Sequence, residues 1–390
     1  MENWKIVRLG DVCEILNGYA FKSDKYVDSG IRVIRITNVQ KGFIEDNSPA
    51  FYPITEKENL KDYELYENDL LISLTGNVGR VALLSKEMLP AALNQRVGCI
   101  RIRDKNLLIS YLFTFLNSDK FESDCIYSAR GIAQKNMSTE WLKNYLIPLP
   151  PIEVQIKIAN NLNTCAKIIK KHNKQLNNFD LLIKSRFIEM FGDEPVENRK
   201  WKVEKLGNLG LCKNGMNFSY EDNGFEINCL GVGDFKDNAV ISNCEKLPVI
   251  SLNEKPSEEY LLKDNDIVFV RSNGNKELVG RSVLVHPRVL TTFSGFCIRF
   301  RLSTDSINHL FLLQFLKMPN TRKNMAGRGA NIQNLNQQIL SNLDIPVPPI
   351  ELQNDFATFV QQIDKSKLAV QKSLEKTEIL YKSLMQAYFG

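Results

Sequence analysis

Histidine is scarce in this 390-residue sequence, which contains only His172, His286 and His309. Histidines so few and so dispersed exclude a histidine-based metal cluster. The eight cysteines show no C-x-x-C spacing, and most lie within apolar runs. A disulfide framework and a zinc site are therefore not expected, and we interpret the cysteines as reduced core thiols of a cytoplasmic protein.

Long apolar runs and targeting signals are also missing. No stretch of about 18 apolar residues occurs, so we expect no membrane-spanning helix and no membrane partner. The first residues, MENWKIVRLGDV, lack the charged-then-apolar pattern of a secretory signal. A hydrophobic content of 43% and a charged content of 24% are ordinary for a folded soluble protein, and the net charge of +5 favours a polyanionic partner only weakly.

The common catalytic motifs are absent as well. The Gly-Val-Gly sequence at 231–233 lacks the third glycine of a dinucleotide-binding loop. The sequence GNKELVGRS at 274–282 has five residues between its glycines, where a phosphate-binding loop has four, and an arginine takes the place of the lysine. We therefore expect no catalytic residues, no metal ligands and no cofactor in this chain.

An internal repeat takes up the whole chain. The sequence IPLPPIEVQ at 147–155 returns as IPVPPIELQ at 345–353, shifted by 198 residues. WKIVRLGDVCEILNGYAF begins at Trp4, its counterpart WKVEKLGNLGLCKNGMNF begins at Trp201, and a Phe-Gly pair ends each copy. A repeat unit of about 195 residues is far longer than the units of solenoids, so the sequence predicts two copies of one domain-sized unit.

Each copy begins with short apolar runs rich in β-branched residues, which predict strands. In the first copy they are IRVIRITNV, NDLLISL, GRVALLS and RVGCIRIR; in the second they are NDIVFVR, GRSVLV and GFCIRFR. A helical segment follows in each copy, LLISYLFTFLNSDKF and INHLFLLQFLKM. We therefore expect mixed α/β domains of the α+β class at 1–148 and 193–346, with long helical segments at 149–192 and 347–390.

The segment after each Pro-Pro pair has the pattern of a long helix. Proline fits the first helical turn, and the glutamate that follows favours the positive N-terminal end. Apolar residues then recur at alternating steps of four and three, which predicts a coiled coil. The predicted seam residues are Ile158, Leu162, Ile169, Leu176, Phe179 and Ile183 in the first helix and Phe356, Val360, Ile363, Val370, Leu374, Tyr381 and Leu384 in the second.

A helix with one apolar stripe is stable only when that stripe is packed, so each long helix is expected to pair with the other. An antiparallel pair, with helices about 57 Å long at ~1.5 Å per residue, would hold the two globular domains at opposite ends. His172 falls on the seam, where we favour a polar residue that sets the register over a metal ligand or a pH switch.

This order of domain, Pro-Pro helix, domain and Pro-Pro helix resembles the specificity subunit of type I restriction-modification enzymes. The resemblance covers the whole chain and depends on three duplicated marks. These are the Pro-x-Pro-Pro-Ile-x-x-Gln helix start, the NDLLISLTGNVGR element with its counterpart NDIVFVRSNGNKELVGR, and the Arg-Gly tails ARGIAQKNM and GRGANIQNL.

The resemblance implies that each globular part is a target recognition domain with bent β-sheets, which reads one half of a split double-stranded DNA sequence. The paired helices would fix the spacer between the halves and dock two methyltransferase (modification) subunits. Those subunits would methylate adenine from S-adenosylmethionine, and restriction subunits joined through them would use ATP and magnesium. The chain itself would be non-catalytic. It lacks the Asp/Asn-Pro-Pro-aromatic motif of adenine methyltransferases, since its Pro-Pro pairs precede Ile-Glu.

The two copies differ at two places. We align NQRVG with TFSGF, so that Asn94 and Gln95 stand opposite Thr292 and Phe293, and the second copy has four extra residues before its Gly-Arg pair. Domains that read different half-sites are expected to diverge there. A DNA contact at Asn94 or Gln95 is therefore not transferred to the second copy.

Polar residues on glycine-bearing loops beside the strands are the candidates for DNA contact. Arginine reads guanine, asparagine or glutamine reads adenine, and lysine and arginine also hold phosphates. In the first domain the candidates are Thr75, Asn77, Arg80, Asn94, Gln95, Arg96, Arg130, Gln134, Lys135 and Asn136. In the second they are Arg271, Asn273, Asn275, Lys276, Arg281, Arg328, Asn331, Gln333 and Asn334. For each residue alone, a solvated loop or a plain turn remains the alternative, and the Arg-Gly pairs have a structural alternative in a glycine with positive φ.

Two other classes of function stay open at this point. A coiled-coil adaptor that tethers proteins without reading DNA would not need the amide- and arginine-bearing loops that both copies have. A self-contained nuclease or methylase would need the catalytic motifs that are missing. A DNA-reading scaffold therefore fits the sequence best.

Overall fold

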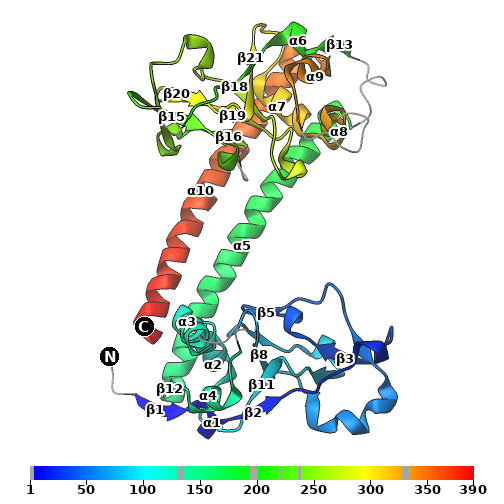
Figure 1. Cartoon of the computed structure of the whole chain (residues 1–390), viewed down its shortest axis with the longest axis vertical. Helices are drawn as coiled ribbons and strands as arrows, with labels where there is room; N and C mark the ends of the chain where they lie inside the picture. The colour runs from blue at the N-terminus through cyan, green and yellow to red at the C-terminus, as the bar shows by residue number, and fades with distance from the viewer. Residues whose placement is uncertain (1–3, 130–135, 194–200, 220–221, 236–238, 327–333) are drawn as a thin grey trace. The chain divides into compact units, whose positions relative to one another are not determined.

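The computed structural model describes residues 4–129, 136–193, 201–219, 222–235, 239–326 and 334–390. The chain forms two compact units: unit 1 is Met1–Asn173 with Lys372–Gly390, and unit 2 is Lys174–Gln371. Each unit contains one globular part and a portion of both long helices (Figure 1). Among the described residues, no helix is both long and apolar enough to cross a membrane.

Two four-stranded sheets form the globular part of unit 1. One is antiparallel, in the order β2 (Cys13–Asn17), β11 (Val97–Ile102), β8 (Leu70–Ser73), β9 (Val81–Leu83). The other has the order β6 (Phe51–Tyr52), β3 (Ile31–Ile34), β10 (Ala91–Leu93), β7 (Glu64–Leu65), with β3 and β10 parallel. The four runs predicted as strands in the first copy contain β3, β8, β9 and β11, so those strand predictions are confirmed.

Short helices and strand pairs complete unit 1. The helices are α1 (Leu9–Val12), α2 (Ile109–Leu116), α3 (Asp119–Ser128) and α4 (Thr139–Asn144). The pairs are β1 (Lys5–Arg8) with β12 (Leu146–Leu149) and β4 (Val39–Gln40) with β5 (Phe43–Ile44). The main core packs α2 and α3 against the sheet of β2 and β8, with Tyr111 and Phe121 fully buried.

Unit 2 repeats this plan with different strand lengths. A five-stranded sheet has the order β14 (Gly210–Asn214), β21 (Cys297–Leu302), β18 (Asp266–Val270), β19 (Ser282–Val285), β16 (Val240–Ile241). A three-stranded sheet has the order β17 (Val249–Leu252), β15 (Phe225–Leu230), β20 (Thr291–Phe293). The remaining elements are the pair β13 (Lys202–Lys205) and β22 (Asp344–Val347) and the helices α6 (Leu206–Leu209), α7 (His309–Lys317), α8 (Pro319–Ala326) and α9 (Gln337–Ser341).

The repeated Asn-Asp sequence before β8 and β18 has a structural cause. Asn68 and Asn265 have φ of 71° and 66°, a left-handed conformation that asparagine tolerates better than most residues. The next residue, Asp266, is fully buried and forms a bidentate ion pair with Arg301 at 2.8 and 2.7 Å. The same pair joins Asp69 and Arg101 in unit 1 at 2.8 and 2.7 Å. This repeated motif therefore fastens neighbouring strands.

The Gln of each Pro-Pro motif fastens a long helix to its domain. The helices are α5 (Ile152–Phe191) and α10 (Ile350–Phe389). Gln155 is fully buried; its Oε1 accepts from the Leu108 N–H at 2.9 Å, and its Nε2 donates to the Asn106 and Pro150 carbonyl oxygens at 2.8 Å. Gln353 makes the three corresponding bonds in unit 2. Each Gln thus bonds the first turn of its long helix to the N-terminus of α2 or α7.

The two long helices pair antiparallel within each unit. In unit 1, Asn161 Nδ2 donates to the Tyr388 hydroxyl at 3.0 Å, and eleven residues further along α5 His172 Nε2 lies 3.2 Å from Ser373 Oγ. The partner number falls as the α5 number rises, which is the signature of antiparallel packing. In unit 2 Asp180 pairs with Lys367. The expected antiparallel coiled coil is confirmed.

Every residue of the predicted seam is buried or half-buried in the structure. The fully packed positions among them are Ile158, Leu162, Ile183, Phe356 and Val360. The polar seam residues His172 and Lys367 bond across to the partner helix, and such polar pairs favour one register over the alternatives.

The aromatic residue at the C-terminal end of each long helix enters a globular core. Phe389 packs edge-to-face on Phe115, with ring centroids 5.2 Å apart, and on Tyr111 at 5.9 Å. In unit 2, Phe191 packs on Phe311 at 4.7 Å. The core of unit 1 thus contains residues from both ends of the chain (Figure 1).

We expect Phe389→Ala to lower the free energy of unfolding of unit 1 by about 3–5 kcal/mol, because it would leave a cavity among buried rings. Urea unfolding followed by tryptophan fluorescence measures the change. The control is Ile379→Ala on the same helix, where the side chain is 62% exposed and a change within about 0.5 kcal/mol is expected. Equal effects of the two substitutions would contradict the role of Phe389 in the core.

Candidate nucleic-acid interface

Three segments predicted to contact DNA meet at one end of the β8–β11 sheet in unit 1. The Leu74 N–H donates to the Arg96 carbonyl oxygen at 3.0 Å, and the Leu74 carbonyl accepts from the Met137 N–H at 2.8 Å. Thr75 also forms an isolated bridge with Asn136. The turn after β8 therefore lies between the turn before β11 and the segment that begins at Asn136.

The same three segments meet in unit 2. The Arg271 N–H donates to the Phe296 carbonyl oxygen at 2.8 Å, and the Arg271 carbonyl accepts from the Leu335 N–H at 2.7 Å. Ser272 forms the isolated bridge with Asn334. Residues scattered over some 60 positions of sequence in each copy are thus held together by backbone hydrogen bonds.

Exposure separates the candidates of unit 1. Asn77, Gln95, Arg96 and Asn136 are exposed, whereas Thr75, Arg80 and Asn94 are half-buried. The Arg80 guanidinium donates to Gln40 Oε1, and Asn94 Oδ1 accepts from the Arg96 N–H at 3.2 Å. These two side chains shape the turns, while the exposed ones are available to a ligand.

The candidates of unit 2 divide in the same way. Asn275 and Asn334 are exposed, and Arg271, Asn273 and Arg281 are half-buried. Asn273 Oδ1 accepts from the Asn275 N–H at 2.8 Å, and Arg271 donates to the Gly295 carbonyl oxygen at 3.2 Å. Lys276 begins a short 3-10 helix, Lys276–Leu278. The predicted residues Arg130, Gln134, Lys135, Arg328, Asn331 and Gln333 lie outside the described residues.

The structure corrects the alignment of the two copies at the turn before β11. Asn94 bridges Tyr19, whereas in unit 2 the residue that bridges Met216 is Ser294. The counterparts of Gln95 and Arg96 are therefore Gly295 and Phe296, two positions further along than we aligned them. Thr292 and Phe293 are buried in β20 instead. The sequence alignment failed because the shift between copies is 198 residues at their ends but 200 between β11 and β21.

Two aromatic residues at this site were not predicted. Tyr19, 38% exposed, accepts a backbone hydrogen bond from Gln95 at 2.9 Å, and Phe296 is 62% exposed. An Asn-Gly pair precedes both Tyr19 and its counterpart Met216, and this repeated pair is the sequence signal that could have pointed to Tyr19. A Cβ on Gly18 would lie 2.2 Å from the Asn94 carbonyl, so this glycine permits the close approach of the two segments.

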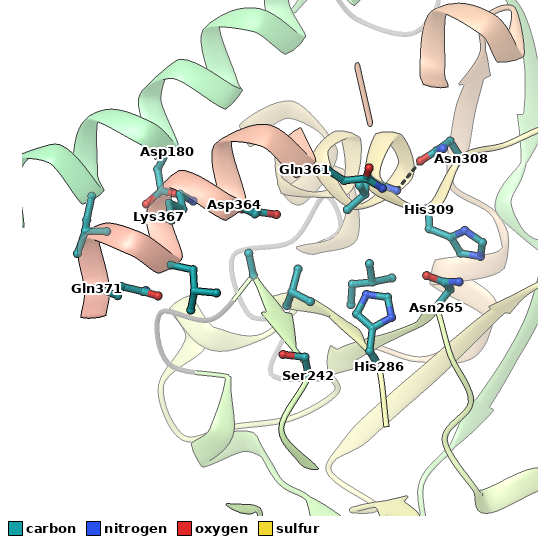
Figure 2. Close-up of a pocket in the computed structure, with 16 residues that line it drawn as sticks. Asp180, Ser242, Asn265, His286, Asn308, His309, Gln361, Asp364, Lys367 and Gln371 are labelled. Atoms are coloured by element: carbon teal, nitrogen blue, oxygen red, sulfur yellow. Dashed lines mark hydrogen bonds and ion pairs between the residues drawn. The ribbon is translucent and has the colours of Figure 1, made fainter. Parts of the chain in front are cut away.

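A polar cavity of about 640 Å³ lies at the opposite ends of β18 and β19 in unit 2. Asn265, just before β18, and His286, just after β19, line it together with His309 (Figure 2). His286 Nδ1 lies 2.7 Å from Asp264 Oδ1, and burial lowers the pKa of His309. Among the described residues, no group of three or more His, Cys, Asp or Glu side chains is placed to hold a metal ion. This cavity is separate from the converging turns.

A family model described as "Type I restriction modification DNA specificity domain" matches the sequence twice, at residues 1–178 and 198–380. The MjaVIII specificity subunit of Methanocaldococcus jannaschii is 24% identical, over 98% of this chain and 91% of the relative. The StySPI specificity subunit of Salmonella potsdam is 24% identical, over 100% of this chain and 89% of the relative.

Solved structures share the fold. The S subunit of a type I restriction-modification system from M. genitalium has a TM-score of 0.56 and 16% identity, covering 98% of this chain and 95% of that one. A chain from "Structural basis underlying complex assembly and conformational transition of the type I R-M system" has a TM-score of 0.59 and 17% identity. The match covers 100% of this chain and 98% of that one. At these identities the likeness extends to the fold alone.

We expect Gly79→Ala to destabilise unit 1 more than Gly76→Ala does. Both glycines have positive φ, 83° and 68°, where an alanine costs about 1–2 kcal/mol. A Cβ on Gly79 would also lie 2.7 Å from Cys125 Cβ on α3, whereas one on Gly76 meets nothing within 4 Å. Overpacking at Gly79 should add about 1–3 kcal/mol. Urea unfolding of both variants measures the change in the free energy of unfolding. Equal decreases for the two variants would mean that the turn at Gly79 does not pack against α3.

Proposed function

Because this chain belongs to the family of type I restriction-modification DNA specificity domains, we propose that the converging turns of its two units read the two halves of a split DNA target. The chain is the non-catalytic specificity subunit of such a system and recognises DNA through two domains. The observation that carries the proposal for these residues is the convergence of the same three segments at the same place in both units. A coiled-coil adaptor that ignores DNA is not favoured.

The exposed side chains of the first domain suit direct reading of bases. Gln95 and Arg96 are neighbours on one turn, and glutamine pairs with adenine while arginine pairs with guanine in the major groove. In this proposal they specify bases, and Asn77 and Asn136, from the two adjoining segments, add contacts to base edges or phosphates.

The second domain presents a different set of groups. Gly295 and Phe296 replace Gln95 and Arg96, and the turn from 271 to 281 is longer and carries Asn275. An exposed phenylalanine can contact the methyl group of thymine, and asparagine can pair with adenine. We therefore expect the two half-sites to differ in sequence.

The long helices provide a docking surface in duplicate. Leu181 and Leu182 on α5 are 61% and 46% exposed, and Ile379 and Leu380 on α10 are 62% and 52% exposed. The second pair is the first shifted by 198 residues, so unit 2 and unit 1 each present one copy. Methyltransferase is the partner that the family indicates, and two equal apolar surfaces favour two methyltransferase subunits, one on each pair.

The remaining assignments follow from this arrangement. We assign reading of DNA to residues 1–148 and 193–346, and spacer setting with subunit docking to 149–192 and 347–390. Restriction subunits join through the methyltransferases, which bind S-adenosylmethionine, while ATP and magnesium act in the restriction subunits. The location is cytoplasmic, in keeping with eight cysteines that are all free thiols.

We expect Arg96→Ala to relax one position of one half-site. The chain is expressed with its methyltransferase, and the methylated adenines of the host genome are mapped. Losing one arginine contact should reduce discrimination at one base pair by about 1–3 kcal/mol and leave the other half-site unchanged. The control is Arg103→Ala, at the other end of β11, where the exposed arginine pairs with Glu14. The proposal fails if no bipartite consensus is found, or if Arg96→Ala alters both halves or neither.

We expect one methyltransferase to be lost for each apolar pair that is made acidic. Leu181→Asp with Leu182→Asp should change a complex of one specificity subunit and two methyltransferases to one and one, and Ile379→Asp with Leu380→Asp should do the same. Combining all four should abolish the complex. Native mass spectrometry measures the stoichiometry, with the exposed Lys382→Asp as control. An unchanged stoichiometry in all variants would exclude this docking surface.

A further inference from the structure

A second cavity of unit 2 lies next to the turn that carries the candidate DNA contacts. Its volume is about 400 Å³. Its polar lining comes from Arg281 at the end of the turn, Ser282 at the start of β19, Lys317 on α7, Arg322 on α8, and Asn177 and Asp180 on α5. All these residues belong to unit 2.

The charged groups around this cavity are mostly cationic. Burial lowers the pKa of Arg322, and the nearby Arg281 lowers it further, against an opposite effect of Glu277. Burial and the neighbouring Lys367 on α10 lower the pKa of Lys317 to about 8, although Asp180 and Asp364 act in the opposite direction.

Asp180, a carboxylate that lines the cavity, already has a partner. Asp180 forms an ion pair with Lys367, and these two side chains lie against each other between α5 and α10 (Figure 2). Among the described residues that line the cavity, Arg281, Lys317 and Arg322 are cationic and Asp180 is the carboxylate. Burial disfavours the charged forms of Lys317 and Arg322, and an anion in the cavity would stabilise both of them.

Two donors on the cavity wall have no hydrogen-bond or ion-pair partner among the residues that the structure describes. Ser282 is 5% exposed, and its buried hydroxyl makes no hydrogen bond. Within the described residues, the Lys317 ammonium also makes no hydrogen bond or ion pair. Buried polar groups in folded proteins are nearly always paired, so an unpaired buried hydroxyl in the lining of a cavity that Lys317 also lines indicates a ligand.

We propose that this cavity binds a phosphate group, held by the Ser282 hydroxyl, the Lys317 ammonium and the arginines beside them. A hydroxyl and several cations are the groups that proteins use for tetrahedral oxyanions. The phosphate comes either from the DNA backbone or from a free phosphate or nucleotide. The cavity adjoins the turn from 271 to 281, which favours the backbone, and this choice of source rests on the proposed function.

The first domain does not share this site. The shift of 200 residues that relates β21 to β11 sets Asn117 opposite Lys317 and Glu122 opposite Arg322. Glu122 forms an ion pair with Lys41 at 2.6 Å. Where unit 2 has a cation facing the cavity, unit 1 thus has a carboxylate with its own partner, so phosphate binding belongs to the second domain.

Sulfate, a tetrahedral dianion that does not titrate between pH 6 and 10, is the probe for the site itself. Calorimetry on the full chain at pH 7 and matched ionic strength should show sulfate binding, which Lys317→Met weakens at least about tenfold and Ser282→Ala about threefold. Lys365→Met, an exposed residue of α10, is the control and should leave binding unchanged.

The pH dependence gives an independent readout. The anion favours protonated Lys317, so sulfate affinity should be constant below pH 8 and fall above it as this ammonium loses its proton, until it reaches the affinity of Lys317→Met. In Lys317→Met the profile should be flat. No difference between the wild-type chain and Lys317→Met in either measurement would overturn the proposal.

The salt dependence of DNA binding distinguishes the sources. If the phosphate belongs to the DNA backbone, Lys317→Met should reduce the slope of log affinity against log salt by about 0.9. An unchanged slope with sulfate binding intact would assign the site to a free phosphate or nucleotide. If the wild-type chain with its methyltransferase bound no DNA, the proposed function would fail, whereas the sulfate experiments would still decide this site.

Discussion

The packing of one apolar stripe against another governs this protein. A 40-residue helix such as α5 gains most of its stability from the side chains that its stripe buries, and α10 supplies the matching stripe. The pairing is antiparallel, so the end of α10 returns to the domain where α5 begins. Phe389 completes a core whose other buried residues come from the first half of the chain. The fold of the N-terminal domain therefore depends on the last helix of the sequence.

The most conspicuous repeated motifs serve this scaffold. The Gln of each Pro-Pro motif bonds a long helix to its domain, and the Asn-Asp sequence makes a left-handed turn followed by a buried ion pair. The glutamines and aspartates of these motifs are buried and hydrogen-bonded, so they are not available to a ligand. A motif that recurs in both copies thus identifies the fold. In the proposed function, the residues that distinguish one DNA half-site from the other lie where the copies differ.

Much of this arrangement could be predicted from the sequence, because a helical stripe and an exposed polar turn are local patterns. The seam from Ile158 to Leu384 and the three turns around Leu74 are of that kind. The buried bonds of Gln155 and the unpaired hydroxyl of Ser282 could not be predicted, because they depend on groups that only the fold brings near. The counterpart of Arg96 was misplaced by two residues for a similar reason. Phe296 is the counterpart of Arg96 because of how the strands pair, and the similarity of the two sequences at this turn does not reveal it.

The turns before β11 and β21 show how two readers can diverge on one scaffold. Each closes with the same backbone hydrogen bond, Val97 N–H to Asn94 O at 2.9 Å and Cys297 N–H to Ser294 O at 2.8 Å. Between these bonds the side chains of Gln95 and Arg96 point to solvent, and exposed substitutions of this kind usually change stability by less than about 0.5 kcal/mol. If these turns read DNA as proposed, replacing the two residues by Gly295 and Phe296 alters which base edges the turn can contact at little cost to the fold. Under the proposed function, a chain built from two such units can acquire new half-sites one turn at a time.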